Sequence, residues 1–217
     1  MKTFYFVRHG ETDWNFQGLV MGQSDIPLND KGRRQAGLLA GRLSRLKNAV
    51  CYSSDLSRAM ETSQILVQKN GLHPIPDARL REIKFGMFEG TSSQDWASLY
   101  PAECESYRRD VLRNAPPGGE SRLQLIGRAA DFLTEISTNS DAENILIVTH
   151  GGTLAAFFNV LLAWDAGREP DEFHRLFQFD NCSLSLVSFR EPRWRVLLAN
   201  CLRHLEEMEE GNPVPGS

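Results

Sequence analysis

The sequence lacks the features that would place the protein in a membrane, outside the cell or on nucleic acid. No apolar run approaches the roughly 20 residues that a membrane-spanning helix needs, and the opening run at residues 4–7 is much shorter than the apolar core of an export signal. The formal net charge is −4, whereas proteins that bind nucleic acid or lipid headgroups usually present a basic face. We therefore expect no export signal, no membrane association and no nucleic-acid partner.

Cysteine is also scarce. The four cysteines lie far apart, at positions 51, 104, 182 and 201, and form no CxxC pair of the kind that indicates a zinc or redox site. No repeat or low-complexity linker divides the 217 residues, and a hydrophobic share of 41% is sufficient for one buried core. We expect a cytoplasmic protein, either a monomer or a homodimer, with one domain at residues 1–205 and an acidic, frayed tail at 206–217.

Short apolar runs alternate along the chain with stretches of helical periodicity. Strands are predicted at residues 4–7, 49–53, 145–148, 183–189 and 193–199. Helices are predicted at residues 30 to about 47, from a cap at Asp55 to about 69, from a capping box at Ser121 and Gln124 onward, and at 154–163. The alternation predicts an α/β fold, a three-layer αβα sandwich with an open, mostly parallel sheet and helices on both faces.

Two histidines follow predicted strands directly. His9 comes after the strand at 4–7, and His150 comes after the strand at 145–148. Ligands of open α/β sheets bind beyond the carboxyl ends of the strands, so both histidines fall at the expected ligand-binding edge. Local patterns do not give the strand order, and whether these two strands are neighbours stays open at this point. Between about 74 and 119, prolines interrupt the periodicity, and we expect loops and short helices, with 85–120 as a lid or insertion.

Four segments, in order along the chain, resemble the signature of the histidine phosphatase superfamily, also called the phosphoglycerate mutase-like family. They are Arg-His-Gly-Glu-Thr at 8–12 with Trp14 and Asn15, Ser-Ser-Asp-Leu-Ser-Arg-Ala at 53–59, Leu-Arg-Glu-Ile at 80–83 with Gly86 and Glu-Gly at 89–90, and Val-Thr-His-Gly-Gly at 148–152. The resemblance spans residues 3 to about 200. It implies a reaction that passes through a phosphorylated histidine.

Five residues would carry that reaction. A phosphate monoester is a dianion, so the site must supply positive charge and hydrogen-bond donors before a nucleophile can attack. The resemblance implies that His9 is the nucleophile and that Arg8 and Arg58 hold the equatorial phosphate oxygens. His150 would complete the phosphate site as a donor, with a ring that is either protonated or in a suitable tautomer. Glu82, at the acid position of the family, would protonate the leaving oxygen and later activate water.

The nucleophile must be neutral at one ring nitrogen. We expect a backbone carbonyl near Gly10 to hold the other ring nitrogen of His9 and thereby to fix the tautomer. Nothing in this chemistry requires a metal ion, and we expect neither a metal nor a cofactor.

Further substrate contacts are expected from Asn15, Gly22 and Gly151. Relatives often carry a polar Thr, Ser or Gln before the glycine at position 22, but this chain has Met21. A side-chain contact to phosphate is therefore not expected from Met21, which leaves backbone N–H groups, with Asn15 and Gln23 as nearby polar substitutes.

The third segment favours hydrolysis over phosphoryl transfer to a second substrate. Arg-Glu-Ile-Lys-Phe-Gly at 81–86, followed by Phe-Glu-Gly, resembles the phosphatase branch, whereas phosphoglycerate mutases typically carry Glu-Arg-His-Tyr-Gly there and a longer insertion. We therefore expect a metal-independent phosphomonoester hydrolase that acts on a small phosphorylated metabolite.

Two alternatives stay open. Arg108 and Arg109, ahead of Pro116 and Pro117, resemble the arginine pair with which mutases hold a second anionic group, so a bisphosphoglycerate-dependent phosphoglycerate mutase is one alternative. A catalytically silent binding module is the other, and it is disfavoured because all five core residues are present.

The physiological substrate is not predicted. Members with similar segments include broad-specificity, phosphoserine and α-ribazole phosphatases, and the sequence does not choose among them. The expected lid contains aromatic residues, which suggest a sizeable or apolar leaving group, and arginines, which suggest an acidic one. They are Phe85, Phe88, Trp96, Tyr100, Tyr107, Arg108, Arg109 and Arg113.

Overall fold

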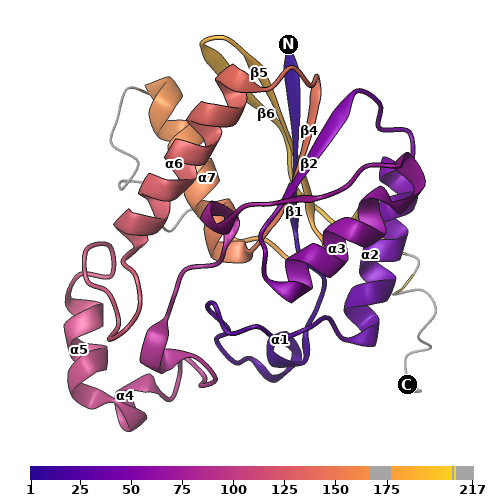
Figure 1. Ribbon diagram of the computed structural model, residues 1–217. Coiled ribbons are helices and arrows are strands. Elements are labelled where there is room, and N and C mark those ends of the chain that lie inside the picture. The colour runs from indigo at the N-terminus through magenta and orange to yellow at the C-terminus, as the bar shows by residue number, and fades with distance from the viewer. Residues whose placement is uncertain (167–176, 207, 209–217) are drawn as a thin grey trace, which may run out of the picture.

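A six-stranded sheet runs through the middle of the protein (Figure 1), in a computed structural model that describes residues 1–166, 177–206 and 208. The spatial order of its strands is β3 (Ile75–Pro76), β2 (Ala49–Ser53), β4 (Asn144–Thr149), β1 (Lys2–Arg8), β5 (Leu184–Arg190) and β6 (Arg193–Cys201). The first four are parallel, while β5 is antiparallel to β1 and β6 is antiparallel to β5. The predicted open, mostly parallel sheet is confirmed, with an antiparallel hairpin at one edge.

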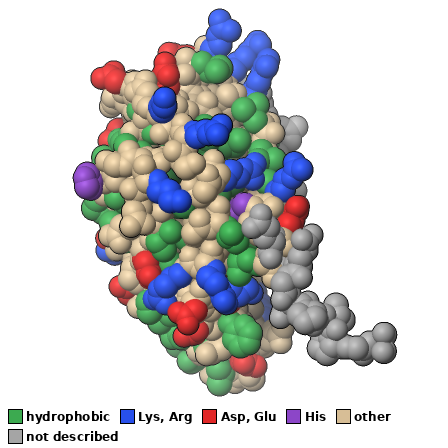
Figure 2. Space-filling model, turned by 90° about the vertical axis from the view of Figure 1, so that its right-hand side faces the viewer, with side chains coloured by type: hydrophobic (Ala, Val, Ile, Leu, Met, Phe, Trp, Pro, Cys, Tyr) green, Lys and Arg blue, Asp and Glu red, His purple; other side chains and the backbone are tan. Residues whose placement is uncertain are grey.

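Helices cover both faces of this sheet. On one side lie α2 (Asp30–Leu43) and α3 (Ser57–Val67), and on the other α6 (Arg122–Asn139) and α7 (Gly151–Ala166), as Figure 1 shows. The predicted three-layer sandwich is therefore confirmed. Figure 2 looks at the side of α2 and α3, where Lys and Arg side chains are spread over the surface. Among the described residues, no helix is long and apolar enough to cross a membrane.

The central strands bury side chains on both faces because helices cover both. In β1, Phe4 and Phe6 pack into the apolar cluster under α6 and α7, whereas Tyr5 and Val7 pack toward α2 and α3. In β4, residues 145 and 147 face the first cluster, and 146 and 148 face the second. A strand buried on both sides has no polar face, which is why these runs are continuously apolar in the sequence.

The predicted capping box at the start of α6 is confirmed. Gln124 N donates to Ser121 Oγ at 3.2 Å, and Ser121 N donates to Gln124 Oε1 at 2.7 Å. These two bonds satisfy N–H groups that an isolated helix end leaves without partners. The apolar side of α6 contains the predicted residues Ile126, Ala129, Leu133 and Ile136, all buried.

Two helix predictions need correction. Helix α2 ends at Leu43, because Ser44 caps it through Gly41 O and the chain turns toward β2. Asp55 does not cap α3, whose N-cap is Leu56 without a side-chain hydrogen bond. Asp55 instead accepts two bonds from Arg81, at 2.7 and 2.6 Å. A paired guanidinium and carboxylate make two charge-assisted bonds, and a capping bond would supply only one.

Segment 85–120 contains short elements, as expected, and carries an apolar cluster of its own. Its elements are η3 (Gly86–Phe88), α4 (Trp96–Leu99) and α5 (Pro101–Arg109); Figure 1 shows α4 and α5 at the lower left, beyond the end of the sheet, and α1 (Asp13–Gln17) at the lower centre. The cluster comprises Phe88, Trp96, Cys104 and Tyr107 and is separate from the two clusters on the sheet. Short 3₁₀ turns complete the described elements, namely η1 (Gln68–Asn70), η2 (Ala78–Leu80) and η5 (Arg203–Leu205). Of the predicted tail, only residues 206 and 208 are described.

The loop after β1 passes very close to the first turn of α2. A Cβ atom on Gly10 would lie 2.5 Å from Gly32 O, and a Cβ atom on Gly32 would collide with the backbone of Glu11. Backbone atoms cannot move aside as a flexible side chain can. The two glycines therefore determine how closely α2 approaches the loop that begins with His9.

We predict that Gly32→Ala lowers the free energy of unfolding by about 1–3 kcal/mol, because the added methyl group overpacks this contact. Gly37→Ala is the matched control, since Gly37 lies in the same helix with nothing within 4 Å of a Cβ atom. It should raise stability by up to about 1 kcal/mol through helix propensity. Urea unfolding of both variants measures the difference, and equal stabilities would contradict the close approach.

Candidate active site

The two histidines lie side by side because their strands are neighbours. β1 and β4 pair in parallel with Arg8 opposite Thr149, and His9 N donates to Thr149 O at 2.9 Å. The ring centroids of His9 and His150 are 5.0 Å apart, with the planes at 61°. The question that local sequence patterns left open is thereby answered, and the edge where these strands end is the candidate site.

His9 is buried and its tautomer is set by its own loop. Its Nδ1 lies 2.7 Å from Gly10 O, and a carbonyl can only accept, so Nδ1 carries the proton and Nε2 is bare. The predicted carbonyl contact is confirmed. Burial, followed by the nearby charges of Arg58 and Arg8, holds the pKa of His9 well below its usual value. The ring is therefore neutral at physiological pH, with a free lone pair on Nε2.

Arg58, in the first turn of α3, is fully buried. Its guanidinium donates to Gly22 O at 2.7 Å, to Ser24 O at 2.8 Å and, through Nε, to His150 Nδ1 at 3.2 Å. Burial lowers the pKa of Arg58 to about 10, which still leaves it charged at neutral pH. The loop that contains Gly22 is thus held by a buried positive charge.

His150 is neutral in this arrangement. Its Nδ1 accepts the proton of Arg58 Nε, so Nε2 carries the remaining ring proton and donates to Ser54 Oγ at 2.8 Å. Burial, and then the charge of Arg58, hold the pKa of His150 well below its usual value. Of the two states that the sequence left open, the structure favours the neutral tautomer over the protonated ring. Ser54 was not singled out as a functional residue, although it lies in the second segment of the resemblance.

One donor of Arg8 has no partner in the part of the chain that the structure describes. Its Nη1 donates to Phe179 O at 2.6 Å, but its buried Nε has no hydrogen-bond partner among the described residues. Burial lowers the pKa of Arg8, and the charges of Glu82 and Asp180 oppose this. The side chain lies against Gly151, where a Cβ atom would be 3.5 Å from Arg8 Nε. An anion bound here would satisfy the free N–H group.

Glu82 is held at the start of α7. Its carboxylate accepts from Gly152 N at 2.9 Å and from Ile83 N at 2.8 Å. A Cβ atom on residue 152 would collide with that carboxylate and displace it from this position. Arg128 and Gln23 both donate to the main-chain carbonyl of Glu82, at 3.0 and 3.1 Å. Gln23 therefore supports the acid residue, rather than standing free for phosphate.

Glu89 connects two loops around the site and was not recognised from the sequence as more than part of the third segment. Its carboxylate accepts from Gln23 N, from Ser24 N and from Phe85 N, at 3.0–3.1 Å. Gly22 adopts a positive φ of 51°, and a Cβ atom there would collide with the Glu89 carboxylate. Gly22 is thus required by backbone conformation and by space.

Met21 packs inward. Its sulfur lies 3.1 Å from Thr12 Oγ1, and the residue is buried.

Asn15 Oδ1 accepts from Thr12 N and from Asn181 Nδ2, both at 3.2 Å. Because its oxygen is occupied by protein donors, the amide NH₂ is the part of Asn15 that could donate to a bound anion.

Asn181 binds the backbone of the loop that contains the nucleophile. Its Nδ2 lies 3.1 Å from His9 O, 3.3 Å from Gly10 O and 3.2 Å from Asn15 Oδ1. The start of an antiparallel strand lies beside the end of its neighbour, and Leu184 of β5 pairs with Val7. Local sequence patterns do not reveal the role of Asn181, because it looks like an ordinary turn residue before a strand. Its place beside His9 follows only from the order of the strands in the sheet.

The structure brings His9, His150, Arg8, Arg58 and Glu82 together from four separate segments. In the part of the chain that the structure describes, no group of three or more His, Cys, Asp or Glu side chains is placed to hold a metal ion.

Comparisons with known proteins show which family the chain resembles. The family model of the histidine phosphatase superfamily (branch 1) matches residues 4–202. Phosphoglycerate mutase-like protein 4 of Arabidopsis thaliana is 35% identical over 207 residues, which cover 93% of this chain and 86% of that protein. Mycobacterial glucosyl-3-phosphoglycerate phosphatase, solved with VO₃, superposes with a TM-score of 0.79 at 29% identity, covering 93% of this chain and 100% of the other. The α-ribazole phosphatase of Shigella flexneri superposes with a TM-score of 0.82 at 25% identity. The superposition covers 92% of this chain and 96% of the other.

The chain belongs to the histidine phosphatase superfamily, and the resemblance of its four segments is confirmed. It is an enzyme of the phosphatase or mutase type, with phosphatases as its structural neighbours.

The two buried histidines predict that stability depends on pH. The pKa values of His9 and His150 are lowered on folding, so the unfolded chain takes up protons near pH 6.5 that the folded protein does not. The free energy of unfolding should fall as pH drops below about 6.5, by up to about 1.4 kcal/mol per pH unit for each histidine. Urea unfolding between about pH 7.5 and 5.5 measures the slope. His9→Gln should lower it, whereas an unchanged slope would contradict a neutral, buried His9. His73→Gln, at an exposed histidine, is the control.

A second prediction concerns Asn181. Replacement by Asp keeps the shape but points a carboxylate at three oxygen acceptors, so the Gly10 carbonyl should lose its fixed orientation and its bond to His9 Nδ1. We expect ¹⁵N spectra of histidine-labelled Asn181→Asp to show His9 as a mixture of tautomers, where the parent protein shows the Nδ1–H form. Asn181→Ala, which removes the donor without adding charge, should give a smaller change. A parent-like His9 spectrum in both variants would show that Asn181 has no influence on the nucleophile.

Proposed function

We propose that the protein is a metal-independent phosphomonoester hydrolase that acts on small phosphorylated metabolites through a covalent phosphohistidine on His9. The observation that carries this proposal is the hydrogen bond between His9 Nδ1 and Gly10 O, because it leaves Nε2 unprotonated in a buried, positively charged setting. A neutral imidazole with a fixed tautomer is the form of histidine that can attack phosphorus.

In the first step the phosphate binds beyond the ends of β1 and β4. Arg8 and Arg58 supply positive charge to the phosphate oxygens, and the free N–H group of Arg8 gains a partner. His150 lies across from His9 and donates from Nε2, exchanging Ser54 Oγ for a phosphate oxygen. The N-terminus of α7 at Gly151, together with the amide of Asn15 and the backbone at Gly22, adds dipoles that favour an anion.

In the second step His9 Nε2 attacks phosphorus, and the bond between phosphorus and the leaving oxygen breaks. The leaving alkoxide takes a proton from the carboxyl group of Glu82. The phosphorylated ring now carries a positive charge, which the Gly10 carbonyl stabilises through its bond to Nδ1–H.

In the third step Glu82 accepts a proton from water, and the resulting hydroxide attacks phosphorus. The P–N bond breaks, the electron pair returns to Nε2, and inorganic phosphate leaves. His9 is neutral again and Glu82 is protonated for another turnover.

A bisphosphoglycerate-dependent mutase is the second candidate. It shares the first two steps but delivers the phosphoryl group to a hydroxyl of a second substrate. The name of the Arabidopsis relative favours it, whereas the names of the two structural neighbours favour hydrolysis. Arg109 is exposed and forms an ion pair with Glu105 at 3.5 Å, whereas Arg108 forms none among the described residues. We therefore retain hydrolysis as the proposal.

The experiment uses 4-nitrophenyl phosphate in excess chelator. Full activity is expected with chelator, and His9→Ala should lose on the order of 10³-fold or more in kcat, since a nucleophile is removed. Nitrophenolate leaves without needing a proton, so Glu82→Gln should release about one equivalent in a burst and then turn over slowly. Mass spectrometry should find one phosphoryl group on His9 in that variant. His73→Ala is the matched control.

Two outcomes would contradict the proposal. Loss of activity with chelator would contradict metal independence, and full activity of His9→Ala would exclude the phosphohistidine. Incubation with 3-phosphoglycerate and a bisphosphoglycerate primer distinguishes the alternatives, because isomerisation faster than phosphate release would identify the mutase.

A further inference from the structure

A cavity of about 520 Å³ lies between segment 85–120 and the start of α6. Its walls combine apolar and aromatic side chains with Ser93 and two arginines. The residues on which the argument depends are Val20, Phe85, Trp96, Tyr107, Arg108 and Arg122. Trp96 and Tyr107 belong to the buried cluster of that segment, so this wall is a packed surface.

Two residues that line the cavity, Phe85 and Val20, are close in the chain to Glu82 and Gly22 of the site. Phe85 comes three residues after Glu82, and Val20 comes two residues before Gly22. Arg122 also lines a narrow cleft with Gly152, whose N–H group holds the Glu82 carboxylate. A substrate whose phosphorus faces His9 and whose leaving oxygen faces Glu82 therefore has its remaining atoms in or beside this cavity.

Among the described residues, Arg122 has no partner for its charge. It is the first residue of α6, and its Nε is buried without a hydrogen bond within the described ranges. None of the described carboxylates forms an ion pair with it. The amino-terminal end of α6 adds to the positive potential at the same place. A buried donor without a partner is costly, so a ligand that accepts from it gains binding free energy.

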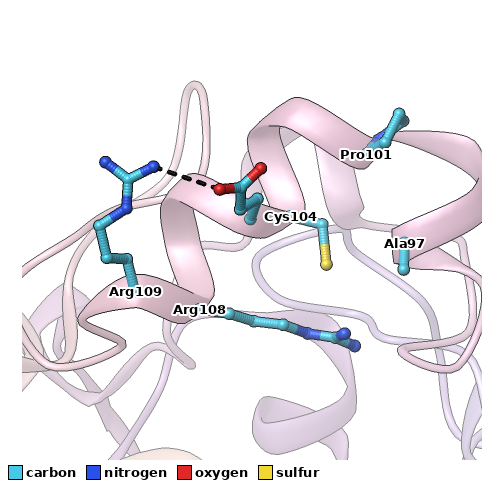
Figure 3. A pocket seen from close by; sticks show the side chains of 6 residues that line it. Ala97, Pro101, Cys104, Arg108 and Arg109 are labelled. Carbon is cyan, nitrogen blue, oxygen red and sulfur yellow. Dashed lines mark ion pairs between the residues drawn. The ribbon is translucent and has the colours of Figure 1, made fainter.

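Arg108 faces the same cavity, and Arg109 does not. Figure 3 shows the two side chains leaving α5 in different directions, with Arg109 turned toward its ion pair. Arg108 forms no ion pair among the described residues and lines both this cavity and an outer pocket of about 410 Å³. The second arginine that lines this cavity is therefore Arg122 of α6, and Arg109 does not line it.

We propose that this cavity binds the leaving group and that Arg122, supported by Arg108, binds an anionic group on it. The proposal rests on the phosphomonoesterase function above and assigns the substrate class as phosphate esters of organic acids with an apolar or planar body. The volume falls within the usual range of about 300–1,000 Å³ for small-molecule sites. A bare three-carbon acid would leave most of it to water, and the aromatic walls would then have no partner.

The test compares two substrates that differ in one charge, phenyl phosphate and 4-carboxyphenyl phosphate. The ratio of their kcat/KM values is measured for the parent protein and each variant, so that intrinsic reactivity cancels between proteins. The parent should favour the carboxylated ester, and Arg122→Gln should lower the ratio by about 10-fold or more. Arg122→Lys should keep part of the preference. Hydrolysis of phenyl phosphate should stay near the parent rate in both, which also reports intact folding.

Arg109→Gln is the matched control and should keep the parent ratio, since its side chain belongs to the outer pocket. Equal ratios in the parent and Arg122→Gln would overturn the proposal, as would an equal loss of activity on both esters. Calorimetry with benzylphosphonate and 4-carboxybenzylphosphonate makes the same comparison without turnover. Should no ester be hydrolysed, the proposed function fails, while a preference for the carboxylated phosphonate that disappears in Arg122→Gln would still support the binding site.

Discussion

The structure around the site depends on the burial of one guanidinium group. Arg58 has no exposed surface, and a buried charge costs several kcal/mol unless its surroundings supply hydrogen bonds. Gly22 O, Ser24 O and the ring of His150 supply them. The same bonds determine where the 22–24 loop lies and which tautomer His150 adopts. The buried charge of Arg58 and the neutral state of the His150 ring therefore depend on one set of contacts.

The sequence predicted the parts of this arrangement that depend on local order. The run at 145–148 is apolar throughout because both faces of β4 are covered, and the tautomer of His9 follows from a carbonyl one residue away. The resemblance identified residues that come from four segments, and the parallel pairing of β1 and β4 explains how two of them meet.

Contacts between distant segments were not predictable. Asp55 could bind either its own helix or Arg81, and only the tertiary structure decides which is closer. Asn181 reaches the nucleophile because β5 is antiparallel to β1, and strand direction is not written in local periodicity. Arg122 lies in the helix whose capping box the sequence predicts, but nothing in the local pattern shows that its Nε is buried without a hydrogen bond among the described residues.

The apolar cluster of segment 85–120 is separate from both clusters that hold the sheet together. Phe88, Trp96, Cys104 and Tyr107 pack mainly against one another, and Glu89 joins the segment to the phosphate side through backbone N–H groups, which every residue type except proline supplies. Replacements in this segment that keep Glu89 can therefore accumulate during evolution without disturbing the phosphate-binding residues. Proteins with the same sheet and phosphate site are therefore expected to differ in this segment and in the substrates they accept.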